Sequence, residues 1–154
     1  PRLRAIDPDS GRYAVVLRTS YKPLDGYTFV DNRGTPSVGR SQGWASVGLN
    51  GLLGWRERFQ FGMFTVPTQP SELMYLEGTY TQALGDNGLS YAVQLSQTEV
   101  DPGSEQNILG TESHASRAQF RLRYPLILAS KQNLWLTGTF DYHDSLNRTQ
   151  ATTG

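Results

Sequence analysis

The residues best suited to bond-making chemistry are a serine between two glycines and a later aspartate–histidine pair. Ser41 lies in Gly39-Arg40-Ser41-Gln42-Gly43, which fits the G-x-S-x-G pattern of a nucleophile elbow, and Asp141 and His143 follow in hydrolase order. That chemistry needs a helix after the serine and a histidine within hydrogen-bond reach. Residues 44–49 alternate like a strand, so the pattern favours a glycine-bearing turn and predicts no enzyme. A membrane-embedded esterase is the enzyme alternative, and it would need Ser41 and His143 to meet on a surface.

Metals, cofactors and nucleic acid have little support in the composition. The chain has no cysteine, and its two histidines, His114 and His143, lie apart from any ligand cluster, so we expect no metal and no cofactor. The 14 basic and 14 acidic residues cancel, so the basic excess of a nucleic-acid-binding domain is absent. The longest apolar run is 126–129, too short for a transmembrane helix of about 20 apolar residues.

Alternation of apolar and polar residues predicts an all-β chain. In residues 117–124 one face is wholly apolar and the other carries arginine and glutamine. The remaining β signals predict an antiparallel meander of seven strands near residues 26–32, 40–50, 58–66, 74–81, 89–97, 117–124 and 134–143. The connections near 51–57, 85–88 and 125–133 are compact, whereas those at 99–115 and after Asp144 are long and polar. Short turns at one rim and longer loops at the other are typical of an outer-membrane barrel.

A soluble β-sandwich is the alternative to a membrane barrel, because its strands also alternate. The predicted strands of about 9–11 residues match a tilted bilayer crossing, whereas strands of globular proteins average about 5–6. Many aromatic residues lie near strand ends, where a barrel has its aromatic girdles. Charges near mid-strand suit either a water-filled lumen or a solvated face, and we expect the lumen. The predicted lumen-facing residues are Glu77, Gln94, Arg117, Arg121, Arg123, Thr139 and Asp141.

The first predicted strand carries the most specific motif, which ends in Asp31-Asn32-Arg33-Gly34 and is followed by Gly39. It resembles the opening of the β-barrel in the TpsB transporters of two-partner secretion, the haemolysin and filamentous-haemagglutinin secretion/activation family. In that family a strand ends in Asp-Asn-x-Gly, a second glycine follows, and strand two leads to an Asn-x-Leu-Gly-type turn. The counterparts are Asp31, Asn32, Gly34, Gly39 and the turn at 50–54. Gly34 is predicted to supply backbone freedom in this first extracellular turn.

The resemblance implies an all-β fold in which residues 26–154 hold about seven of an expected sixteen barrel strands. Residues 1–25, with Pro8-Asp9-Ser10-Gly11, resemble the end of a POTRA-like periplasmic domain and a linker. The implied function is a pore of the bacterial outer membrane that translocates an unfolded secreted partner. The implied partners are this client polypeptide and outer-membrane lipid, with no nucleic acid. The family's inward-folded loop with a Val-Arg-Gly-Tyr-type motif is nowhere in the chain. The alternatives are an outer-membrane protein insertase of the same superfamily and a soluble β-sandwich binding module.

Overall fold

The computed structural model describes residues 2–7, 12–16, 20–34, 39–101 and 111–149. Two of its strands, β1 (Arg2–Asp7) and β2 (Arg12–Val16), form an antiparallel pair of their own. The other seven form one sheet: β3 (Leu24–Asp31), β4 (Gln42–Asn50), β5 (Glu57–Thr65), β6 (Leu73–Leu84), β7 (Leu89–Val100), β8 (Thr111–Leu128) and β9 (Asn133–Thr149). The described ranges contain no helix that is long and apolar enough to cross a membrane.

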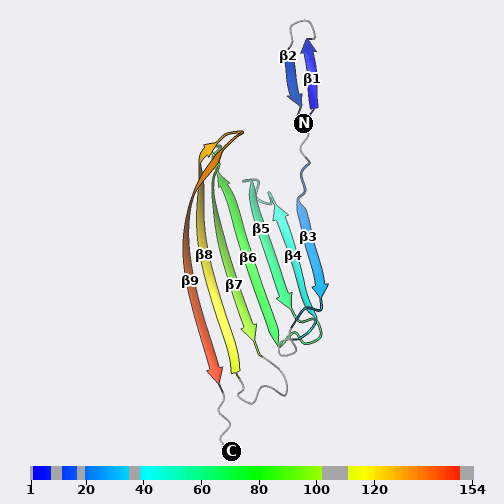
Figure 1. Ribbon diagram of the computed structural model, residues 1–154, viewed down its shortest axis with the longest axis vertical. Helices are drawn as coiled ribbons and strands as arrows, with labels where there is room; N and C mark the ends of the chain where they lie inside the picture. Colours follow the sequence, from blue (N-terminus) through cyan, green and yellow to red (C-terminus); the bar gives the residue numbers. More distant parts are fainter. Residues whose placement is uncertain (1, 8–11, 17–19, 35–38, 102–110, 150–154) are drawn as a thin grey trace, which may run out of the picture.

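The large sheet is a simple meander, because its strands lie side by side in chain order from β3 to β9 (Figure 1). Each strand pairs antiparallel with the one before it, as short connections between consecutive strands require. The prediction of an all-β chain with seven antiparallel strands is therefore confirmed.

Several strand bounds differ from the predicted ones. β3 begins at Leu24, inside the segment expected to be a linker, and β8 begins at Thr111, inside the expected long loop, of which residues 102–110 lie outside the described residues. β8 also continues through Pro125, with a shift of register between Pro125 and Ile127. Proline has no N–H to donate to the ladder, and a bulge is where a strand can accept it. The β8–β9 connection is therefore shorter than predicted, at 129–132.

β8 and β9 are also longer than predicted, with 18 and 17 residues. On β9 the apolar positions of one face run from Leu134 to Tyr142, and Asp144 follows on the same face. On β8 the side chains opposite these residues also change from apolar to polar, because Ala118 pairs with Tyr142 and Ser116 pairs with Asp144. Both strands therefore continue beyond this apolar band with a more polar composition, and β7 pairs with β8 there as far as Val100 and Ser113.

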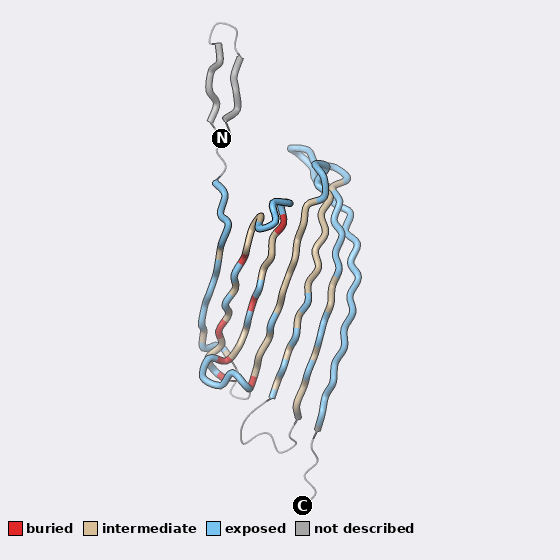
Figure 2. Tube along the Cα trace, turned by 180° about the vertical axis from the view of Figure 1, so that it is seen from behind, coloured by how far each residue is buried: buried red, intermediate tan, exposed pale blue. Residues whose placement is uncertain are grey.

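The sheet is a single layer almost without a core. In the described part of the chain, Val66 is the one hydrophobic residue that is buried, and strand elements contact only their neighbours in the sheet. Figure 2 shows the same result, since nearly all of the sheet is coloured exposed or intermediate. A β-sandwich buries the inner faces of two stacked sheets, so the described residues do not form the soluble sandwich that was the alternative.

Candidate functional site

The cross-strand register places all seven predicted lumen residues on one face of the sheet. Residues that pair directly across a ladder point to the same side, as do alternate residues along a strand. Gln94 pairs with Gln119, and Gln119 pairs with Asp141, so these three lie side by side. The same reasoning across β6 to β9 gives one set, and we call its side the polar face: Glu77, Gln94, Arg117, Arg121, Arg123, Thr139 and Asp141.

An ion pair joins β8 to β9 on the polar face. Arg117 Nη2 lies 2.6 Å from Asp141 Oδ1, and the side chains are 54% and 40% exposed. Gln119 Nε2 donates to the same oxygen at 2.9 Å, and Arg121 Nη2 donates to Gln119 Oε1 at 2.5 Å. At this exposure water weakens the attraction. The pair therefore contributes mainly by neutralising one carboxylate and by setting the positions of its neighbours.

Glu77 occupies a different environment on β6. Its Oε2 accepts hydrogen bonds from Tyr75 Oη at 2.8 Å and from Gln94 Nε2 at 3.1 Å. In the described ranges no lysine, arginine or histidine lies within ion-pair distance of it. Tyr75 in turn stacks on Trp44 of β4, with ring centroids 6.4 Å apart and an interplanar angle of 28°. Glu77 is thus held by two neutral donors beside a pair of aromatic rings.

Arg123 and Thr139 complete the predicted set toward the β8–β9 turn. The guanidinium carbon of Arg123 lies 3.9 Å from the ring centroid of Trp135, which is cation–π geometry. Thr139 pairs with Arg121 across the ladder and presents a hydroxyl beside it. This end of the polar face therefore carries two arginines whose described contacts are with a ring and an amide.

A further polar cluster at the start of β3 was missed by the sequence analysis. Arg58 donates from Nη1 and Nη2 to the two carboxylate oxygens of Asp25, at 2.6 and 2.8 Å, and from Nη1 to Asn50 Oδ1 at 2.8 Å. Asn50 Nδ2 donates to Asp25 Oδ2 at 2.8 Å and to the Lys22 carbonyl at 2.9 Å. The hydroxyl of Tyr21 also donates to the Asn50 carbonyl. The only signal in the sequence was that polar residues recur at three strand ends of one rim.

The opposite side of the sheet is apolar and open. Leu95, Leu136 and Phe140 lie on it with exposed fractions of 58%, 59% and 68%. Soluble monomers rarely expose contiguous apolar patches larger than a few hundred Å². A surface of this kind, stretching across the strands of a single sheet, needs an apolar environment around it.

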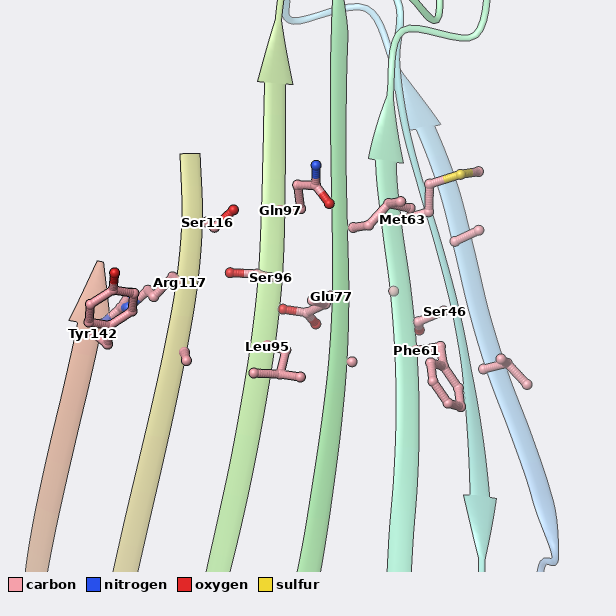
Figure 3. Close-up of a pocket in the computed structure, with 16 residues that line it drawn as sticks. Ser46, Phe61, Met63, Glu77, Leu95, Ser96, Gln97, Ser116, Arg117 and Tyr142 are labelled. Carbon is pink, nitrogen blue, oxygen red and sulfur yellow. The ribbon is translucent and has the colours of Figure 1, made fainter. Parts of the chain in front are cut away.

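A hollow of about 800 Å³ lies against this apolar side, and Figure 3 shows the side chains around it. Phe61 and Met63 from β5, Leu95 from β7 and Tyr142 from β9 contribute to its lining. Ser46, Glu77, Ser96 and Arg117 also line it, but its surface is mostly hydrocarbon and aromatic. The hollow therefore suits apolar contact better than catalysis.

The Asp-Asn-x-Gly motif forms the turn that follows β3. Asp31 is the last residue of the strand, and its Oδ1 accepts a hydrogen bond from the Arg33 N–H at 3.2 Å. Asn32 follows it as an exposed bend. An aspartate that bonds to the backbone two residues later stabilises a turn locally. Asp31 therefore stabilises the start of this turn, while the role of Asn32 in the turn stays a prediction.

Gly34 and Gly39 have different reasons to be glycine. The φ of Gly34 is outside the left-handed region, so the predicted need for backbone freedom there is wrong. An added Cβ at Gly34 would lie 2.0 Å from the Gly39 carbonyl oxygen, and its N–H donates to the Arg40 carbonyl at 3.0 Å. Gly39 does adopt a positive φ of 98°, and a Cβ there would meet Val66 Cγ1 at 2.5 Å. Space is the requirement at Gly34, and both space and conformation are required at Gly39.

The residues of the possible hydrolase are not brought together. Ser41 precedes β4 directly, so a strand follows it where a nucleophile elbow has a helix. His143 lies on β9, and four strands separate β4 from β9 in the sheet. Asp141 is hydrogen-bonded to Arg117 and Gln119. The described ranges also contain no group of three His, Cys, Asp or Glu side chains placed to hold a metal ion.

Comparisons with known proteins agree with this architecture. The family model for the haemolysin secretion/activation protein ShlB/FhaC/HecB matches residues 13–152. Among solved structures, CdiB from Escherichia coli has a similar fold, with a TM-score of 0.68 at 15% sequence identity. That similarity covers 86% of this chain and 25% of the CdiB chain, so the chain spans about a quarter of the length of that relative. Comparison with curated protein sequences gives no match.

The family match extends from β2 to just beyond β9, and so includes the whole meander. The family consists of transporters and not of enzymes, as the interpretation of the G-x-S-x-G stretch required. The chain therefore belongs to the haemolysin secretion/activation protein family ShlB/FhaC/HecB, the TpsB-type transporters of two-partner secretion.

Proposed function

We propose that the full-length protein is an outer-membrane pore that translocates an unfolded secreted partner, and that β3 to β9 form one part of its wall. The observation that carries this proposal is the contrast between the two faces of one coreless sheet. One face carries exposed leucine and phenylalanine, and the other carries charged and amide side chains. A barrel wall between lipid and water needs this arrangement. Membership of a transporter family supports it.

The polar face is proposed to line the lumen. Its groups are spread over four strands, from Glu77 on β6 to Thr139 and Asp141 on β9. Such a wall offers many weak contacts, which lets an extended chain bind and still advance. Translocation of this kind requires no bond-making chemistry in the protein. A water-filled lumen also solvates charged side chains near the middle of a strand, so these charges need no buried partner.

The apolar face is proposed to contact lipid of the bacterial outer membrane. The apolar positions of β9 from Leu134 to Tyr142 cover the length of about 9–11 residues that a tilted strand needs to cross a bilayer. The family is one of outer-membrane proteins. In this orientation the turn with Asp31, Asn32, Gly34 and Gly39 is extracellular, and the turns at 51–56 and 85–88 are periplasmic. Residues 1–25 are proposed to be the end of a POTRA-like domain and a linker, with β3 beginning just inside that boundary.

Cysteine labelling of the full-length protein in outer-membrane vesicles tests the orientation. Thr139 and Phe140 are neighbours on β9 with opposite facing, and this part of the chain has no native cysteine. We expect a charged, membrane-impermeant maleimide to modify Thr139→Cys much faster than Phe140→Cys. Equal rates would overturn the proposed lumen.

Removal of the full-length protein from its native cells tests the function itself. We expect a secreted protein to disappear from the medium and to accumulate in the periplasm. Loss of unrelated outer-membrane proteins with normal secretion would contradict the pore and would favour the insertase instead.

A further inference from the structure

Carboxylates of the polar face differ in how they are neutralised. Asp25 pairs with Arg58 and Asp141 pairs with Arg117, each at 2.6 Å. Glu77, near the middle of β6, has two neutral hydrogen-bond donors and no cationic partner in the part of the chain that the structure describes. Its negative charge is therefore available to a group that approaches from outside the sheet.

Two aromatic rings flank this carboxylate because β5 has a glycine at the adjacent position. Gly62 pairs with Glu77 on one side and with Ser46 on the other. A Cβ on Gly62 would lie 2.5 Å from Trp44 Cη2 and 3.1 Å from Glu77 Cγ. The missing side chain thus lets the indole of Trp44 and the side chain of Glu77 approach one another over β5. Tyr75 stacks on that indole and donates to Glu77.

This set of groups has the chemistry of a cation site. Both described hydrogen bonds of Glu77 end on Oε2, so Oε1 has no described donor. Aromatic faces attract ammonium and guanidinium groups, and a carboxylate makes charge-assisted hydrogen bonds to them. The neutral donors from Tyr75 and Gln94 fix the carboxylate without neutralising it. A structural ion pair would have placed an arginine here, as Arg117 is placed beside Asp141.

A small hollow lies beside the two residues that hold the carboxylate. A hollow of about 190 Å³ on the polar face is lined by Tyr75 and Gln94, the two residues that hold Glu77, and by Ser96, which pairs with Glu77 across the ladder. Glu77 and Trp44 do not line this hollow themselves; Arg117 does, and it is already paired with Asp141.

We propose that Trp44, Tyr75 and Glu77 form a binding site for a single basic side chain, lysine or arginine, carried by an extended polypeptide segment. The inference rests on the proposed function, because it requires that the polar face line a lumen in which such a segment lies. The segment comes either from the translocated client or from another part of the full-length protein. Each source would present the same ammonium or guanidinium group to the site.

Photo-crosslinking of the full-length protein in liposomes tests the site. Benzoylphenylalanine replaces Ser46, which pairs with Gly62 and so faces the same side. The probes are a short Gly/Ser/Thr peptide with one central arginine, and the same peptide with glutamine or with glutamate at that position. We expect the arginine peptide to be captured about fivefold more than the glutamine peptide, the preference that one half-exposed ion pair provides. Without any peptide, an adduct to a lysine or arginine of the protein's own chain identifies the internal source and supports the site equally.

Variants at Glu77 make the test specific. Glu77→Gln keeps the shape and an acceptor oxygen, so the barrel forms, but the arginine preference or the internal adduct falls to the background level. Glu77→Lys shifts the preference to the glutamate peptide. Thr79→Val, on the same face of β6, leaves the wild-type preference unchanged. A preference that survives Glu77→Gln, or a wild type that shows neither arginine preference nor a basic internal adduct, would overturn the cation site.

The cysteine-labelling rates at Thr139 and Phe140 are measured on the same preparation. If these rates differ as proposed while the arginine preference is absent, the lumen stands and only the cation site fails. If the rates are equal, the proposed lumen itself fails.

Discussion

Placing an arginine on the apolar face gives the most direct measure of which side of the sheet meets lipid. Leu122 is the residue to change, because it is 42% exposed and lies between Arg121 and Arg123, which point to the polar face. Its partner on β9 is Gly138, where an added Cβ would meet nothing within 4 Å. An arginine at position 122 would therefore find no side chain of β9 to bind.

The expected cost follows from the depth of Leu122. It is one of the central apolar positions of β8, between Phe120 and Tyr124. An arginine at the bilayer midplane on a barrel surface costs about 2–4 kcal/mol. That free energy lowers the folding equilibrium constant by about 30- to 700-fold, at one factor of ten per 1.4 kcal/mol.

The assay is denaturant titration of the full-length protein folded into phospholipid vesicles. Leu122→Arg is compared with Thr79→Arg on the polar face of β6, where Glu77 lies two residues away on the same side. A third variant, Leu134→Arg, lies at the beginning of β9, where the cost near an interface is about 0–1 kcal/mol. We expect Leu122→Arg to have the largest cost and Thr79→Arg to be close to neutral.

Two results would refute the reasoning. Equal free energies of unfolding for Leu122→Arg and Thr79→Arg would mean that neither face meets lipid. A larger cost for Thr79→Arg would mean that the facing is reversed.

Three further predictions concern stability and use the same titration. Gly39→Ala is expected to cost at least about 1–2 kcal/mol, because alanine disfavours a positive φ and its Cβ would meet Val66; a neutral effect would contradict the described turn. Asn50→Ala is expected to cost about 1–3 kcal/mol through its lost hydrogen bonds, with Asn50→Asp as the control that keeps the acceptor. Trp135→Leu should remove about 0.5–1 kcal/mol of cation–π attraction, and this loss should vanish when Arg123 is already glutamine.

The sequence alone was sufficient to predict which residues of the strands share a side of the sheet. A period of two assigns each residue of a strand to a side, and compact turns fix how consecutive strands pair. Seven residues on four strands could therefore be placed on one face before the register was known. The same logic separated Ser41 from His143, because strands that are far apart in a meander stay far apart in the sheet.

The sequence pattern did not predict where the strands end or which side chains contact one another between strands. Past Pro125 the alternation gives way to the apolar run 126–129. A proline normally marks the end of a strand, and the bulge that accepts it leaves no sequence pattern. The Asp25–Arg58 pair joins residues 33 positions apart on strands that are not adjacent, which neither spacing nor propensity encodes. At Gly34 the residue type was identified correctly but for the wrong reason, because steric room depends on the neighbouring chain.

The near absence of a core also changes what each position in this sheet has to satisfy. In a globular domain a side chain must fit the shapes of many neighbours at once, so substitutions are coupled to one another. Among the described residues Val66, directly after β5, is the one buried hydrophobic residue, and the apolar residues of the strands must suit mainly the medium on their side. Substitutions that exchange one apolar residue for another, or one polar residue for another, then affect stability nearly independently. The backbone fold can persist while most residues are exchanged. A common fold with CdiB at 15% identity is the outcome such a wall permits.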